Sequence, residues 1–143
     1  MLKGIPAIIS PQLLACLSEM GHADEIVIAD GNFPAASMAK KLIRCDGHGV
    51  PEVLKAVLKL FPLDIYVEKP VALMEVVPGD KTKPVIWKEY KKIIESSGEK
   101  FDDFEFVERF EFYERAKQAF AVVATSESAL YANIILKKGV IKS

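Results

Sequence analysis

The stretch from Met20 to Asp30 carries the residues best suited to chemistry. His22 lies in a turn that leads into an apolar run, and Asp30 directly follows that run. Histidine titrates near neutral pH, whereas aspartate stays ionised and accepts hydrogen bonds. One such acid/base group and one orienting carboxylate are enough to move a proton to or from a sugar hydroxyl. Each residue alone also fits a structural role, His22 as a solvated loop residue and Asp30 as the start of an Asp-Gly turn.

A helix followed by a buried strand would position these two residues. Ser10-Pro11 supplies an N-cap and a first-turn proline, apolar residues follow at helical spacing, and Gly21 can end the helix. The run 25–29 is too continuously apolar and β-branched for a one-sided strand, which predicts a buried strand of an α/β sheet. Asp30 would then lie at the carboxyl end of that strand, where open α/β sheets bind ligands.

The rest of the chain alternates between strand and helix patterns. Extended segments are expected at 42–45, 63–67, 71–77, 121–124 and 134–136, and helices at 35–41, 51–61, 84–98 and 110–120. In the last of these helices, Glu111 and Arg115 are expected to pair on the surface at i,i+4 spacing. With 143 residues, 50% of them hydrophobic, the chain can bury one substantial core, so we expect a single domain over 1–143.

The charge balance indicates a small neutral ligand. Nineteen basic and twenty acidic residues leave a formal charge of −1 without a basic face, so neither nucleic acid nor an acidic membrane is an expected partner. No signal peptide and no apolar run of about 18 residues is present, which predicts a cytoplasmic protein. Cys16 and Cys45 fall in apolar patterns, as reduced buried thiols do.

Further polar residues outside the first stretch are candidates for a site. Asp64 stands in an apolar setting, which suits either a cap of a neighbouring helix or a site residue, since carboxylates are rarely buried without a partner. Arg109 and Tyr113 share one helix face. Tyr131 and Asn133 are two residues apart, so in an extended segment they would offer a hydroxyl and an amide to one polyhydroxylated ligand.

Motifs spread over nearly the whole chain resemble those of the L-fucose mutarotase and D-ribose pyranase family, with the fucose mutarotases as the more similar branch. The segments that carry this resemblance are Leu2-Lys3-Gly4-Ile5-Pro6, Met20-Gly21-His22-Ala23-Asp24-Glu25-Ile26, Ala29-Asp30-Gly31-Asn32-Phe33-Pro34, Pro62-Leu63-Asp64, Glu108-Arg109-Phe110-Glu111-Phe112-Tyr113-Glu114-Arg115-Ala116 and Tyr131-Ala132-Asn133-Ile134-Ile135-Leu136-Lys137-Lys138-Gly139.

The resemblance implies a fold, an activity and a set of residues. The fold is a single α/β domain with three layers, α/β/α, around a mixed sheet, in a ring-forming homo-oligomer. The implied activity interconverts the anomers of a free monosaccharide, L-fucose or a related sugar such as ribose, in a site without metal or cofactor. On matching positions the implied catalytic residues are His22 as proton donor, Asp64 and Tyr113, and the implied substrate-binding residues are Asp30, Arg109, Tyr113, Tyr131 and Asn133.

Two positions depart from the family pattern. This chain has Ala23 and Ala132 where the family often has glycine. Alanine disfavours a positive φ, so a left-handed backbone at either position would change the local geometry of the site. If the glycines serve only close packing, the extra methyl group is a small change.

The sequence leaves three questions of function open. Either Tyr113 or Tyr131 could relay the second proton of a ring opening. The same Asp, Arg, Asn and Tyr residues would also suit a non-catalytic sugar-binding or transport-accessory protein, which has no use for a proton shuttle. A metal-dependent isomerase or lyase would instead use His22, Asp24, Asp46 and His48, although no third ligand stands at a recognisable spacing from the two histidines.

Overall fold

The computed structural model describes residues 1–143, which form six strands and five helices. The strands are β1 (Glu25–Ala29), β2 (Leu42–Cys45), β3 (Val71–Met74), β4 (Glu105–Val107), β5 (Ala121–Thr125) and β6 (Ile134–Lys137). The helices are α1 (Pro11–Glu19), α2 (Ala35–Met38), α3 (Val50–Leu58), α4 (Ile86–Ser96) and α5 (Arg109–Gln118). The strands form one sheet in the order β2-β5-β1-β6-β3-β4. The sheet is mixed, because β6 runs antiparallel to both of its neighbours while the other pairs are parallel.

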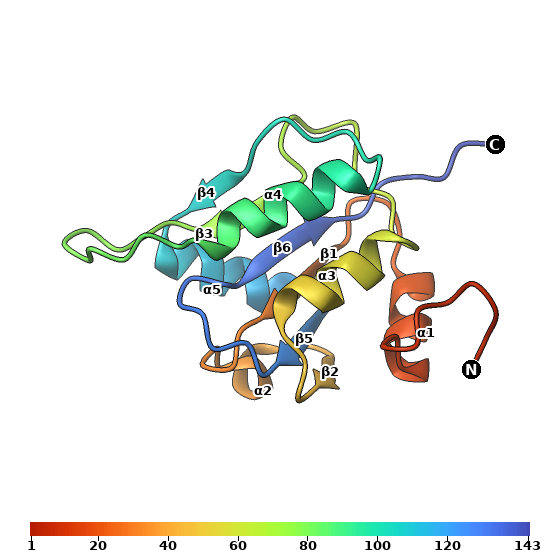
Figure 1. Ribbon diagram of the computed structural model, residues 1–143, viewed down its shortest axis with the longest axis horizontal. Helices are drawn as coiled ribbons and strands as arrows, with labels where there is room; N and C mark the ends of the chain where they lie inside the picture. The colour runs from red at the N-terminus through yellow and green to blue at the C-terminus, as the bar shows by residue number, and fades with distance from the viewer.

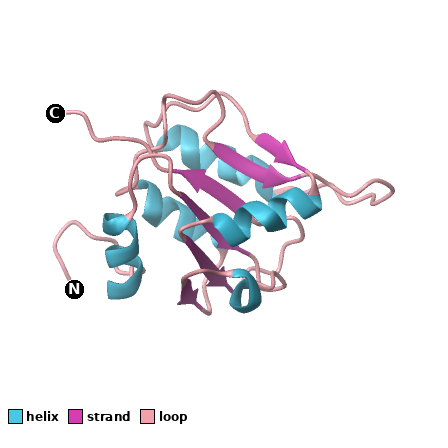
Figure 2. Cartoon of the chain, turned by 180° about the vertical axis from the view of Figure 1, so that it is seen from behind, coloured by secondary structure: helices cyan, strands magenta, loops and turns pink.

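Helices cover both faces of the sheet (Figures 1 and 2). Apolar residues of α1, α3 and α4 pack in one core cluster, and those of α2 and α5 pack in a second. Strand β1 contributes to both clusters, Ile26 and Ile28 to the first and Val27 and Ala29 to the second. Successive side chains of a strand point to opposite faces, so this strand is buried on both sides. The predicted buried strand and the three-layer α/β/α fold are thereby confirmed.

The segment before β1 leaves His22 in a loop. The Ser10 Oγ accepts a hydrogen bond from the Leu13 N–H at 3.1 Å and caps α1, with Pro11 in the first turn. The helix ends at Glu19, and Met20 serves as its C-cap. Five residues later β1 begins at Glu25, which is paired with Lys137 of β6.

The segment 63–67 is not the extended strand that its sequence predicts. Leu63 alone makes a bridge, an antiparallel one with Lys138. The next residues turn, because the Asp64 Oδ1 accepts the Tyr66 N–H at 3.0 Å, the local hydrogen bond by which aspartate competes with a sheet ladder. The strand predicted over 71–77 is also shorter than expected and ends at Met74.

The predicted pair between Glu111 and Arg115 is wrong. The Arg115 guanidinium instead binds the Glu25 carboxylate at 2.6 Å and the Glu105 carboxylate at 2.9 Å. It therefore ties α5 to the start of β1 and to β4. These two partners lie 90 and 10 residues away in sequence, a separation that local helical spacing does not reveal.

The thiols and the helices agree with the sequence patterns. Cys16 and Cys45 are free and buried, and burial raises the pKa of both thiols, which keeps them protonated and unreactive. None of the helices has the length and hydrophobicity that crossing a bilayer requires.

Candidate active site

His22 faces the Asp64 carboxylate. The His22 Nε2 lies 3.1 Å from the Asp64 Oδ1, with the imidazole 44% exposed and the carboxylate 2% exposed. The Tyr66 ring packs edge-on against the imidazole, with 5.4 Å between the ring centroids. The imidazole is thus held by a buried anion and flanked by Tyr66, and its exposed part is open to a ligand.

The charge on Asp64 fixes the role of each imidazole nitrogen. Burial raises the pKa of the Asp64 carboxyl, but hydrogen bonds from the Tyr66 N–H and from His22 lower it by more, so the pKa lies below its ordinary value. The ionised carboxylate accepts the Nε2 proton, which leaves the lone pair of a neutral imidazole on Nδ1. That nitrogen makes no hydrogen bond within the chain and is the one that can take up a proton.

Lys137, the last residue of β6, and the two residues after it hold the loops of both partners. The Asp64 N–H donates to the Lys137 carbonyl at 3.0 Å, and the Ala23 N–H donates to the Lys138 carbonyl at 2.8 Å. A Cβ on Gly139 would collide with the backbone of Leu63, so glycine is required at this close approach. His22 and Asp64 are therefore fixed relative to one another through the same short piece of backbone.

The two departures from the family pattern differ in conformation. Ala23 has a φ of +72°, in the left-handed region, which costs a non-glycine residue about 1–2 kcal/mol. Ala132 does not have a positive φ. The left-handed residue beside it is Tyr131, with a φ of +57°. The backbone next to His22 is therefore strained by the alanine, whereas the Ala132 methyl group affects only packing.

The five predicted substrate-binding residues line one pocket at the other end of β1. The pocket has a volume of about 260 Å³ and contains Asp30, Arg109, Tyr113, Tyr131 and Asn133, together with Asn32, Phe33, Pro34, Met74, Val77, Asp80 and Leu130. Two carboxylates, a guanidinium, two phenols and two amides thus surround a space with apolar walls. Such a mixture of donors and acceptors is suited to a small polyhydroxylated molecule.

Asp30 and Asn133 are held together at the base of this pocket. The Asn133 Oδ1 accepts the Asp30 N–H at 2.7 Å, and the Asp30 Oδ1 accepts the Asn32 N–H at 3.0 Å. Both residues are buried, at 7% and 5% exposure. The Asn133 amide nitrogen remains as a donor and the second Asp30 oxygen as an acceptor. Burial raises the pKa of the Asp30 carboxyl, although backbone N–H groups oppose part of this shift.

The raised pKa of Asp30 predicts that Asp30→Asn will increase the free energy of unfolding at neutral pH. The parent carboxylate is then ionised at a desolvation cost, and this cost disappears as the pH falls through the folded-state pKa. The advantage of the variant should therefore vanish below about pH 3.9. Urea unfolding of the variant and the parent, at neutral pH and below about pH 3.9, measures the difference in their free energies of unfolding.

Asp64→Asn is the matched control, because the pKa of Asp64 is shifted in the opposite direction. Its ionised form stabilises the fold above the unfolded-state pKa, and this stabilisation is lost as the pH falls through the folded-state value. Asp64→Asn should therefore be less stable than the parent at neutral pH. An equal change in the free energy of unfolding in both variants would contradict the opposite pKa shifts of Asp30 and Asp64.

Arg109 and Tyr113 enter the pocket from the first two turns of α5. The Arg109 guanidinium lies over the Phe110 ring at 4.6 Å and has no ion pair within the chain. The Tyr113 ring packs edge-on against Phe33 at 5.8 Å, and its hydroxyl has no hydrogen-bond partner in the chain. The planar fork of the guanidinium and the free hydroxyl are therefore available to a ligand.

Tyr131 differs from its predicted extended conformation. Its φ of +57° turns the backbone, and its hydroxyl donates to the Asp80 carboxylate at 2.6 Å and accepts the Val77 N–H at 3.3 Å. The hydrogen bond to Asp80 raises the pKa of the Tyr131 phenol. Tyr131 still lines the pocket, but its hydroxyl is already engaged.

Asp30 could either orient His22 or accept a sugar hydroxyl, and the structure argues against the first role within one chain. The two residues flank β1, whose five residues rise about 3.3 Å each, so they lie on the order of 20 Å apart. Asp64 takes the orienting position instead. The predicted residues thus form two groups, the proton-transfer pair His22 and Asp64 at one end of the sheet and the binding pocket at the other.

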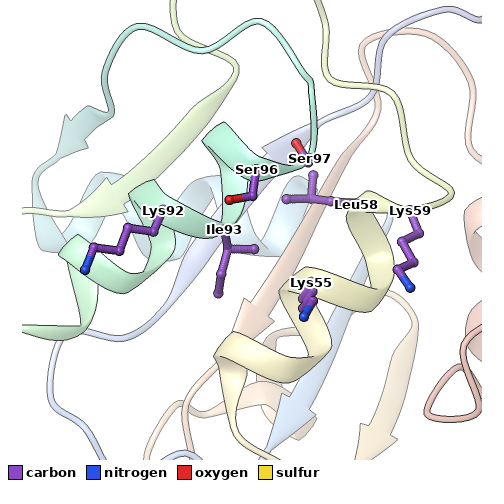
Figure 3. Close-up of a pocket in the computed structure, with 7 residues that line it drawn as sticks. All are labelled: Lys55, Leu58, Lys59, Lys92, Ile93, Ser96 and Ser97. Carbon is purple, nitrogen blue, oxygen red and sulfur yellow. The ribbon is translucent and has the colours of Figure 1, made fainter.

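The residues of the alternative metal site do not converge. His48 pairs with Glu52 at 3.2 Å, Asp46 binds Arg44 at 2.9 Å, and no three His, Cys, Asp or Glu side chains in the chain are grouped as metal ligands are. A groove of about 340 Å³ between α3 and α4 contains none of the predicted site residues (Figure 3). Lys59 and Lys92 lie at opposite ends of this groove, and no carboxylate lines it.

Two contacts of the site were not predicted from sequence. Tyr66 packs on His22, and Asp80 binds Tyr131 across 51 residues. Asp80 stands in the turn Pro78-Gly79-Asp80, where an aspartate is ordinary, so the sequence holds no signal for its second role.

The family of this chain follows from a match over nearly its full length. Residues 3–141 match the sequence pattern of the RbsD / FucU transport protein family. The chain belongs to this family. Its relatives include a protein named fucose mutarotase from Homo sapiens, 56% identical over 146 residues that cover 98% of this chain and 94% of the relative. An L-fucose mutarotase from Actinobacillus pleuropneumoniae serotype 5b is 51% identical over 140 residues, with 98% and 97% covered.

Solved structures of the RbsD / FucU family share the fold. The fucose mutarotase from Streptococcus pneumoniae in complex with L-fucose superposes with a TM-score of 0.94 at 55% identity, over 99% of this chain and 100% of that one. RbsD from Bacillus subtilis, complexed with D-ribose, superposes with a TM-score of 0.71 at 25% identity, over 99% and 100%. The resemblance found in the sequence is confirmed, and the fucose mutarotases are more similar than the ribose-binding relative.

Proposed function

We propose that this chain is an isomerase, a sugar mutarotase that interconverts the α and β anomers of free L-fucose. The observation that carries the proposal is the His22–Asp64 pair, since an imidazole held by a buried, ionised carboxylate is of use to a proton transfer and not to passive binding. The pocket around Asp30 and Arg109 would recognise the sugar. The similarity to proteins named fucose mutarotase supports L-fucose as the substrate.

Mutarotation needs two proton transfers and no redox step. The anomeric hydroxyl loses a proton while the ring oxygen gains one, and the C1–O5 bond breaks to give the open-chain aldehyde. Rotation about C1–C2 and reclosure on the other face of the carbonyl yield the second anomer, with both protons returned. His22 exchanges one of the protons through Nδ1, because its Nε2 proton is held by Asp64.

Tyr113 is the proposed partner for the second proton. Its hydroxyl has no hydrogen bond within the chain, whereas the Tyr131 hydroxyl is occupied on both sides by Asp80 and the Val77 N–H. Asp30, Arg109 and Asn133 would hold the sugar hydroxyls through an acceptor, a planar fork and an amide donor. In this assignment Tyr131 forms part of the pocket wall and binds rather than reacts.

The separation of the two groups leads us to propose a homo-oligomer with shared sites. One monosaccharide is too small to reach from His22 to Asp30 within a chain, so a second copy would supply the missing half. Large apolar side chains are exposed at both ends, Ile65 and Tyr66 beside Asp64, and Phe110 and Leu130 beside Arg109 and Tyr131. A contact between two different patches is head-to-tail. Repeated contacts of this kind close into a ring when the rotation between neighbouring subunits permits it.

The prediction that tests the function compares two sugars. Anomer exchange of L-fucose, measured by NMR saturation transfer, should be accelerated much more than that of D-glucose, because the similar proteins are named fucose mutarotases. Spontaneous exchange without protein is the baseline for each sugar. Binding of L-fucose with exchange at the spontaneous rate would support the alternative, a non-catalytic binding or transport-accessory protein, and equal acceleration of both sugars would contradict the substrate assignment.

We also place the protein in the cytosol. Two free, buried cysteines suit a reducing compartment. Cell fractionation with compartment markers tests this proposal.

A further inference from the structure

The segment Tyr131–Asn133 carries two of the binding residues and has an unfavourable backbone. Tyr131 has a φ of +57°, a conformation that L side chains rarely adopt. The segment leads directly into β6, and the Asn133 Oδ1 accepts the Asp30 N–H at 2.7 Å. A shift of this backbone would therefore move Tyr131 and Asn133 and release Asp30. Such a strained segment persists only where its surroundings hold it.

Helix α4 supplies two hydrogen-bond donors to consecutive carbonyls of this segment. The Trp87 Nε1–H donates to the Tyr131 carbonyl at 2.8 Å, and the Tyr90 hydroxyl donates to the Ala132 carbonyl at 2.6 Å. Trp87 and Tyr90 are three residues apart and so lie on one face of α4, which runs across β3 and β6 (Figure 1). Burial raises the pKa of the Tyr90 phenol, which therefore stays protonated and keeps its donor.

The other end of Tyr131 is held by the arm between β3 and α4, residues 75–85, which extends from the body of the molecule in Figure 1. Asp80 on this arm accepts the Tyr131 hydroxyl proton, and the Val77 N–H donates to the same oxygen. The backbone and the hydroxyl of one pocket residue are thus fixed from two directions. Trp87 and Tyr90 do not themselves line the pocket.

We propose that Trp87 and Tyr90 are positioning residues for substrate binding. They keep the Tyr131 and Ala132 carbonyls turned toward α4, so that the side chains of Tyr131 and Asn133 are presented to the pocket. This inference rests on the proposed function for the identity of the sugar, but it concerns affinity and not the proton transfer. Loss of either donor should weaken binding while the His22–Asp64 pair stays intact.

A pair of Trp87 variants separates the hydrogen bond from the packing. Trp87→Phe keeps an aromatic ring but has no N–H, whereas Trp87→His is smaller but can place Nε2–H where the indole Nε1–H lies, since both belong to five-membered rings attached at Cγ. Titration calorimetry should show a Kd for L-fucose about three- to tenfold higher in Trp87→Phe, the effect of one neutral hydrogen bond. Trp87→His should recover most of this loss, and exchange at saturating sugar should stay near the parent rate in both.

Phe106→Leu is the control for aromatic packing alone. Its ring lies 5.2 Å from that of Trp87, is 46% exposed and is not part of the pocket, so this variant should bind L-fucose as the parent does. The chain has a single tryptophan, so the indole N–H gives one NMR signal, which should exchange slowly with solvent in the parent and in Phe106→Leu.

The outcomes of this experiment distinguish the two proposals. Unchanged affinity in Trp87→Phe, or affinity in Trp87→His no better than in Trp87→Phe, would overturn the positioning role. A parent protein that binds L-fucose without accelerating exchange would overturn the mutarotase proposal and leave the affinity comparison valid. A parent that binds no L-fucose would overturn both.

Discussion

Replacement of His22 by asparagine should slow anomer exchange by roughly 10²-fold or more and leave the fold intact. Asparagine retains an N–H that can donate to the Asp64 carboxylate, so the buried charge keeps a partner. The His22 side chain is 44% exposed and carries little core packing, so its loss should change stability far less than the 2–5 kcal/mol of a core truncation. Asparagine cannot take up and return a proton near pH 7, so binding should survive better than turnover.

His48→Asn provides the matched control for this variant. His48 is the only other histidine, is likewise paired with a carboxylate, Glu52 at 3.2 Å, and lies outside the pocket. NMR saturation transfer should give the parent rate for His48→Asn, and circular dichroism should give parent-like spectra for both variants. A folded His22→Asn protein that exchanges anomers at the parent rate would show that His22 is not the acid/base, and Tyr113 would be the next residue to test.

Two inactive variants should restore activity to each other when they assemble together. If one subunit supplies His22 and the next supplies Asp30, then oligomers of His22→Asn alone or of Asp30→Asn alone contain only defective sites. Random assembly of equal amounts creates intact sites where an unaltered His22 meets an unaltered Asp30, which is about one quarter of all contacts in a ring. Exchange activity should therefore rise from near the spontaneous rate to a substantial fraction of the parent activity.

The mixing experiment has to include proof of assembly. Co-expressed or co-refolded variants should sediment as oligomers, and separately purified variants combined without subunit exchange should remain inactive. A species of 15.8 kDa alone at micromolar concentration would refute the homo-oligomer. A mixed oligomer no more active than the mean of its parents would show that each site lies within one chain.

The elements that set the fold could be predicted because their signals are local. Ser10-Pro11 begins α1, and the apolar run after Glu25 forms β1, as its composition indicates. The segment 63–67 was predicted as extended because its apolar residues outnumber its single carboxylate. The turn depends on one hydrogen bond from the Tyr66 N–H to Asp64, and the composition of a segment does not predict a bond of this kind.

The partners within the site could not be predicted from the sequence pattern, because they are distant along the chain. Asp30 ends the apolar run that follows His22, but the strand between them separates the two residues, and Asp64 comes from 42 residues away. Tyr131 and Asn133 do line one pocket, but the left-handed backbone at Tyr131 replaces the extended segment that the sequence predicts. It follows from hydrogen bonds to α4 and to the arm 75–85, which exist only in the folded chain.

Strand β6 joins two parts of the sheet, β2-β5-β1 on one side and β3-β4 on the other. It is also the last of the six strands along the chain. A ribosome, which adds about 5–20 residues per second, therefore synthesises the other five strands before β6. Until residues 134–137 emerge, the inner edges of β1 and β3 remain unpaired and can bind other strands. Asn133 before β6 and Lys138 after it hold the two groups of the site, so neither group is complete in the nascent chain. The interval before this one short strand is made is therefore the one in which the nascent chain is most open to non-native strand pairing.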